Sequence, residues 1–113
     1  MPTPDDFRRL ALALPETEER RHMGHPDFRV GGKVFATLAY PGPDWGMVRL
    51  MPEQQADFMA LSPAFEPAPG AWGRGGNTLV RLAEVDAGLL ETALRAAWRE
   101  RAPRGLQTRL EGD

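Results

Sequence analysis

Apolar residues recur with the period of an α-helix at the start of the chain. Thr3 followed by Pro4 predicts a helix start, because threonine is a favoured N-cap and proline fits the first helical position. Pro15 predicts the end of this helix. The apolar positions between them follow the spacing i, i+3, i+4 and i+7: Phe7, Leu10, Ala11 and Leu14. This spacing predicts an amphipathic helix with one face against a core.

Between residues 18 and 50 the pattern changes to short runs that are typical of β-strands. Gly31-Gly32 predicts a two-residue hairpin turn, because glycine readily adopts the positive φ angles that such turns need. Further turns are expected at residues 24–26 and 41–44, where Gly, Pro and Asp gather. The expected strands cover residues 19–23, 27–30, 33–40 and 45–50. The sequence therefore predicts an antiparallel β meander.

The rest of the chain alternates helical and strand patterns. Pro52 opens a second expected helix that Ser62-Pro63 ends, and a last helix is expected from an Asp86 N-cap to about Arg101. Between them lie a Pro-rich loop at 63–69, a Gly-rich segment at 70–76 and a strand at 77–82. We therefore predict an α+β fold, an antiparallel β-sheet meander flanked by N-terminal, middle and C-terminal helices. We expect one domain over residues 1–113, with a tail that frays after about residue 105.

The composition excludes several classes of protein. The chain is 42% hydrophobic and 27% charged, as ordinary globular proteins are. Cysteine is absent, which excludes disulfides and thiolate chemistry, and the formal net charge of -2 supplies no overall attraction to nucleic acid. No apolar run approaches the roughly 20 residues of a membrane helix. No secretory leader is visible either, so we expect a cytoplasmic protein outside the membrane.

Few residues in the sequence offer catalytic or metal-binding chemistry. His22, His25 and Asp27 are the one candidate metal site. A spacing of three along a strand places the two rings on opposite faces, unless the turn at Gly24 redirects one, so we expect no metal. Ser62 is the sole serine, and no glycine-flanked nucleophile motif surrounds it. We predict no catalytic residue, no cofactor and no enzymatic activity.

The segment Gly73-Arg74-Gly75-Gly76 resembles a phosphate-binding loop only in its glycine content. Such loops follow a strand and open a helix whose amino end holds the anion, whereas here a strand follows. We interpret these glycines as the beginning of a strand or as a β-bulge, with Trp72 anchoring the loop.

Positive side chains gather on the expected hairpins. The stretch from Arg20 to Lys33 contains both histidines and one acid, Asp27. Such side chains on β-ribbons can contact the phosphate backbone of DNA. The alternative is an ordinary solvated strand face, because Glu18 and Glu19 adjoin the patch. The candidate nucleic-acid-binding residues are Arg20, Arg21, His22, His25, Arg29, Lys33, Arg74 and Arg81.

A binding pocket without catalysis is the second functional hypothesis. Aromatic side chains with polar edges can line a cleft for a small molecule or for a partner protein. We expect this pocket beside Trp72, with Tyr40 and Trp45.

Motifs spread along the chain carry a resemblance to a known family. They are LALALPETEE at 10–19, HPDFRVGGKVFA at 25–36, LMPEQQ at 50–55, AWG at 71–73, TLVRL at 78–82 and AWR at 97–99. With these motifs nearly the whole chain resembles the MmcQ/YjbR family. The resemblance implies a CyaY-like α+β domain whose hairpins form a proposed double-wing motif that binds DNA. It also implies aromatic and basic positions at Phe28, Lys33, Phe35 and Trp72, and it implies no catalytic set.

Overall fold

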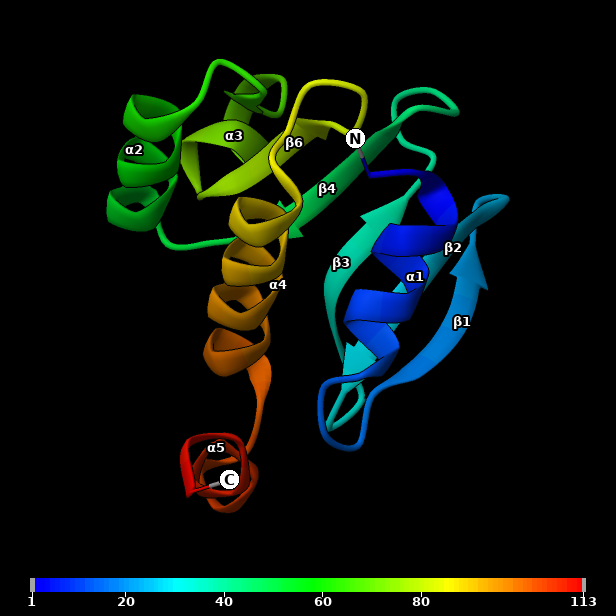
Figure 1. Cartoon of the computed structure of the whole chain (residues 1–113), viewed down its shortest axis with the longest axis vertical. Helices are drawn as coiled ribbons and strands as arrows, with labels where there is room; N and C mark the ends of the chain where they lie inside the picture. Colours follow the sequence, from blue (N-terminus) through cyan, green and yellow to red (C-terminus); the bar gives the residue numbers. More distant parts are fainter. Residues whose placement is uncertain (1, 113) are drawn as a thin grey trace.

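The structure, a computed structural model, describes residues 2–112 and is built on one antiparallel sheet (Figure 1). Its strands are β1 (Glu18–His22), β2 (His25–Val30), β3 (Lys33–Leu38), β4 (Trp45–Arg49), β5 (Phe65–Pro67) and β6 (Asn77–Arg81). Its helices are α1 (Pro4–Leu12), α2 (Pro52–Leu61), α3 (Gly70–Arg74), α4 (Ala87–Arg101) and α5 (Arg104–Gly112). The strand order is β1-β2-β3-β4-β6-β5. The predicted α+β fold with an antiparallel meander is confirmed.

Both hairpins at the start of the sheet close with two-residue turns. Gly31 and Gly32 have φ angles of 59° and 79°, as the sequence predicted. The turn before them lies at Met23-Gly24, with φ angles of 54° and 80°, and not at residues 24–26. Positive φ at both central positions matches the twist of the flanking strands, so β2 begins at His25.

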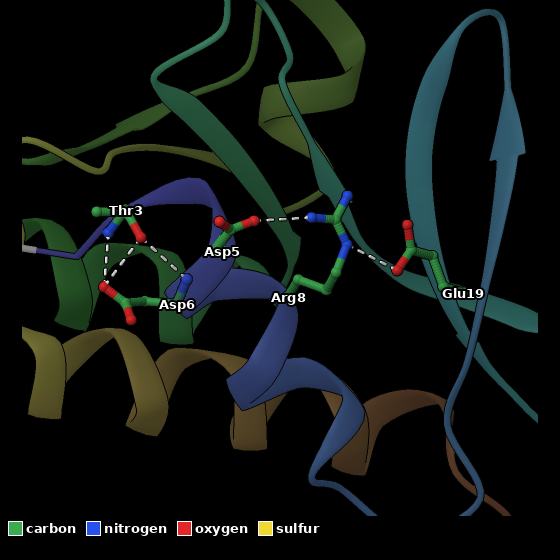
Figure 2. Close-up of polar contacts among 5 residues, drawn as sticks. All are labelled: Thr3, Asp5, Asp6, Arg8 and Glu19. Atoms are coloured by element: carbon green, nitrogen blue, oxygen red, sulfur yellow. Dashed lines mark hydrogen bonds and ion pairs between the residues drawn. The ribbon is translucent and has the colours of Figure 1, made fainter.

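Helix α1 begins with a capping box, shown in Figure 2. The backbone N–H of Asp6 donates to Thr3 Oγ1 at 3.2 Å, and the backbone N–H of Thr3 donates to Asp6 Oδ2 at 2.9 Å. One turn later, Arg8 donates through Nε to Glu19 Oε1 at 2.9 Å and through Nη1 to Asp5 Oδ1 at 3.2 Å (Figure 2). The Arg8 contact to Glu19 fastens α1 to the edge strand β1.

Helices α1 and α4 cover one face of the sheet and form the main core (Figure 1). Trp98 of α4 is fully buried, and its Nε1–H donates to the carbonyl oxygen of Pro15 at 3.1 Å. This hydrogen bond joins the last long helix to the chain just after α1. The other largest buried side chains of this core are Phe7, Phe28, Phe35, Leu82, Leu90 and Leu94.

The segment after α2 contains two elements that the sequence did not predict. The Pro-rich loop at 63–69 includes the short strand β5, which pairs with β6 and carries Pro67 at the edge of the sheet. The glycine segment forms the short helix α3 before β6, where the sequence predicted a bulge or a strand beginning at these glycines. Gly73 makes this possible, because a Cβ there would lie 1.9 Å from the Ala68 carbonyl oxygen.

The end of the chain forms helix α5, and the expected fraying after about residue 105 stays a prediction. Two contacts account for the helix. Gln107 donates through Nε2 to the Ala102 carbonyl at 2.9 Å, and Leu106 packs against the main core. Across the described residues, no helix combines the length and the apolar character needed to cross a bilayer.

Candidate functional site

One row of side chains crosses the face of the sheet that is turned away from α1 and α4. Side chains alternate between faces along a strand, so the neighbours of core residues Phe28, Ala36, Val48 and Val80 point the other way. The register of the strands aligns these neighbours from β2 to β6: Asp27, Thr37, Met47 and Leu79. We call the side of the sheet that they define the second face. All four are buried although α1 and α4 lie on the opposite side.

Three aromatic rings form a wall on the second face. The His25 and Tyr40 rings meet edge to face with centroids 5.6 Å apart, and the Tyr40 and Trp72 rings do so at 6.1 Å. Trp72 is still 47% exposed, so one side of its indole remains free to contact another molecule. Trp72 lies on helix α3, and Asn77 Nδ2 of β6 donates to its backbone carbonyl at 3.2 Å.

A buried carboxylate lies beside this wall. Asp27 is fully buried and accepts hydrogen bonds from Arg29 Nε at 2.8 Å and Arg29 Nη2 at 3.0 Å. His22 Nδ1 lies 2.5 Å from Asp27 Oδ2. The Arg29 hydrogen bonds lower the pKa of Asp27; burial opposes this shift, and the contact from His22 adds to it. Asp27 is therefore a charged carboxylate whose two oxygens are both occupied.

These residues enclose two adjoining hollows. The larger has a volume of about 430 Å³, and its lining residues are His22, Met23, His25, Thr37, Tyr40, Met47 and Trp72. The smaller has a volume of about 170 Å³, and its lining residues are His22, Arg29, Val34, Thr37, Met47, Arg49 and Trp72. Because four lining residues are common to both, we treat them as one site and call it the second-face pocket. Its larger part is mostly apolar, and its smaller part carries two guanidinium groups.

A third hollow, of about 300 Å³, lies where α1 and α4 begin. It has no aromatic wall, and its charged side chains are those that cap and flank the helix ends. Its lining residues are Pro2, Asp6, Arg9, Leu10, Ala87, Gly88 and Glu91. We therefore place the candidate site on the second face.

The aromatic residues predicted for a pocket divide into two groups. Tyr40 and Trp72 line the second-face pocket, as expected for that hypothesis. Trp45 lies beside them in a small apolar cluster and is covered by Arg81, whose guanidinium carbon is 4.8 Å from the indole centroid. Trp45 does not line the second-face pocket.

The basic residues predicted to contact nucleic acid lie on different sides of the sheet. His22, His25 and Arg29 line the second-face pocket. Arg20 is opposite Asp27 in the register and shares that face, whereas Arg21 alternates to the other face and donates to the Gly24 carbonyl at 3.2 Å. The remaining three candidates lie outside the pocket lining: Lys33 at the second hairpin, Arg74 on α3 and Arg81 on β6.

Several of these cations already have carboxylate partners. Arg20 Nε lies 3.1 Å from Glu18, and Arg81 Nη2 lies 3.2 Å from Glu66. Arg29 is held by Asp27. The exposed positive charge of the hairpins is therefore smaller than the sequence suggests.

The two histidines lie closer together than their spacing predicted. His22 and His25 are partners across the first hairpin, and both line the larger hollow, so the stated exception, a turn at Gly24 that redirects one ring, applies. The Met23-Gly24 turn between them causes this, because it reverses the chain within two residues. Even so, no group of three or more His, Asp or Glu side chains within residues 2–112 is arranged to hold a metal ion.

The sequence reasoning missed Thr37, Met47 and Arg49. The signal that could have found two of them is the alternation of strand β4, because Met47 and Arg49 follow Trp45 at steps of two. The side chain of Arg49 is partly buried, and its guanidinium makes no hydrogen bond or ion pair with any residue that the structure describes.

Comparison with known proteins gives two matches. The sequence model of the YjbR family matches residues 12–100. The fold is similar to the crystal structure of Deinococcus radiodurans protein DR2400, which carries a DUF419 domain, with a TM-score of 0.77 and 22% sequence identity. That similarity covers 99% of this chain and 89% of the other, and it shows a shared fold. No curated protein matches the chain.

Proposed function

The chain belongs to the YjbR family, and we propose that it is a binding module that holds a small molecule with a flat, apolar body in the second-face pocket. The family predicted from the sequence motifs is thereby confirmed. We assign no catalytic step to the pocket, and we place its activity in the cytoplasm, the compartment predicted from the sequence.

The exposed indole of Trp72 beside a preformed hollow carries this proposal. A volume of about 430 Å³ falls within the roughly 300–1,000 Å³ that small-molecule sites occupy. Aromatic and methionine side chains around such a volume favour a flat apolar body. This size favours a small molecule over a segment of a partner protein.

A screen of small aromatic compounds by melting temperature tests the proposal, because a ligand that binds the folded state raises that temperature by mass action. We expect at least one compound to stabilise the wild type. In Trp72→Ala its affinity should fall about tenfold or more, as expected for loss of a large aromatic contact. Leu61→Ala is the control, since Leu61 is an exposed apolar residue on α2 outside the pocket lining. A panel without a single stabilising compound, or equal binding by Trp72→Ala, would exclude the pocket as the site.

Duplex DNA is the second candidate ligand, supported by three exposed cationic side chains on the first two hairpins. These are Arg20, Arg21 and Lys33. Their contacts would go to phosphates, so the affinity should fall steeply as salt rises. The test is a titration of labelled duplex DNA with the wild type and with a variant in which all three become Gln. DNA binding is rejected if no complex forms at low ionic strength, or if the triple variant binds equally well.

A further inference from the structure

Among the residues that the structure describes, Arg49 has no counter-ion, and it lies at the smaller end of the second-face pocket. It lies on β4 opposite Asn77 of β6, which offers it no charge. No described residue forms a hydrogen bond or ion pair with its guanidinium. Its side chain lines the smaller hollow together with Arg29 and Trp72.

The surroundings of Arg49 oppose its charge. Burial lowers the pKa of the Arg49 guanidinium, and the positive charge of Arg101 lowers it further. Arginine remains protonated in proteins, so a positive charge stays partly buried without compensation. An anion that enters the smaller hollow would remove this cost.

Arg29, the other guanidinium in this hollow, differs from Arg49. Its Nε and Nη2 atoms both bind Asp27, which is fully buried and neutralises it. The Asp27 oxygens are thus occupied within the protein, and Arg49 remains the guanidinium with donors to spare. A planar guanidinium binds carboxylate and phosphate groups with paired hydrogen bonds.

We propose that Arg49 binds the carboxylate or phosphate group of a small molecule whose flat apolar body lies against Trp72 in the larger hollow. This inference rests on the proposed small-molecule function and specifies its ligand class as aromatic or similarly flat acids. Since the two hollows share His22, Thr37, Met47 and Trp72, one molecule can reach both.

Acids paired with their uncharged amides test the charge requirement while keeping the apolar body constant. The pairs are benzoate with benzamide and naphthoate with naphthamide, and phenyl phosphate tests the phosphate class. Calorimetric titration near neutral pH measures each affinity. We expect an acid or the phosphate to bind the wild type about tenfold or more tightly than the matching amide, as a charge-assisted hydrogen bond allows. Tighter binding of phenyl phosphate than of benzoate would identify the phosphate class.

Arg49→Gln should weaken binding of the acid much more than binding of the amide, and so remove the preference for the acid. Arg74→Gln is the matched control, because Arg74 is exposed on α3 and lies outside the pocket lining. The melting temperature of Arg49→Gln verifies that it folds, and we expect no loss. If amides bind as tightly as acids, or if Arg49→Gln keeps the preference for the acid, then Arg49 does not bind the anion. The proposal of a small-molecule pocket is then unaffected. If no member of any pair binds, the pocket itself fails, and the anion site fails with it.

Discussion

Arg29 holds the buried carboxylate of Asp27 with two parallel hydrogen bonds, Nε at 2.8 Å and Nη2 at 3.0 Å. Replacing Asp27 by Asn keeps the shape of the side chain and removes its charge. We expect Asp27→Asn to lower the free energy of unfolding by about 2 kcal/mol, less than the roughly 3–5 kcal/mol of a wholly buried pair, because Arg29 stays 27% exposed. Urea unfolding measures this loss.

Arg20→Gln is the control for that measurement. Its ion pair with Glu18 lies on the protein surface at 3.1 Å. Exposed pairs contribute about 0–1 kcal/mol, so the control should unfold almost as the wild type does. If the two variants lost the same unfolding free energy, the buried carboxylate would stabilise the fold no more than a surface ion pair does.

Acid should weaken the fold through the same carboxylate. Hydrogen bonds from Arg29 lower the pKa of Asp27 below its ordinary value of 3.8, so the folded state holds this proton less tightly than the unfolded state does. Stability from Asp27 is therefore fully present above that ordinary pKa and is lost as the pH falls through the lower pKa of the folded state. The gap in unfolding free energy between wild type and Asp27→Asn should narrow below about pH 4. Unfolding curves at several pH values measure it, and a constant gap would contradict the pKa shift.

Two neighbouring glycines should differ sharply in their tolerance of alanine. At Gly76 the φ angle is 110°, and an added Cβ would lie 2.0 Å from the Leu50 carbonyl oxygen. Gly75 has a φ of -82°, and its nearest contacts would be an ordinary 3.5 Å. We expect Gly76→Ala to cost at least about 2 kcal/mol and Gly75→Ala to stay within about 0.5 kcal/mol of the wild type. Thermal unfolding of both variants gives the comparison. Similar melting temperatures would contradict the conclusion that only Gly76 requires glycine.

Trp98→Phe should destabilise the main core. The substitution removes the indole N–H that donates to the Pro15 carbonyl at 3.1 Å, and it leaves unfilled space in a fully buried site. Together these losses should cost about 2 kcal/mol. Trp72→Phe is the control, and its exposed indole should make the cost less than about 0.5 kcal/mol. Chemical denaturation followed by far-UV circular dichroism compares the two without depending on tryptophan fluorescence.

The regular elements of the fold could be predicted because their signals are local. Thr3 and Asp86 cap the helices predicted at those positions, and Gly31-Gly32 closes the expected turn. The elements that the sequence missed depend on distant partners. Strand β5 contains proline and exists because it pairs with β6, and α3 needs the close approach of Gly73 to Ala68. No window of sequence reports such pairings.

The candidate site was only partly predictable for a related reason. Tyr40 and Trp72 could be selected as amphipathic aromatic residues, and both line the pocket. In the sequence, nothing distinguishes Arg49 from any other arginine on a strand. Only the strand register shows that its partner on β6 is the uncharged Asn77. The sequence, in contrast, overstated the positive charge of the basic patch. It does not show that Glu18, Asp27 and Glu66 form ion pairs with arginines of that patch.

The two outer strands of the sheet affect the tendency of this protein to aggregate at high concentration. An unpaired strand edge can recruit a strand from a second molecule and so begin aggregation. Strand β5 is three residues long and contains Pro67, which lacks a backbone N–H to offer. Strand β1 reads Glu-Glu-Arg-Arg-His, so a neighbouring molecule would have to approach through a row of charges. The basic residues that first suggested a partner thus also belong to the charged edge that disfavours pairing with a further strand.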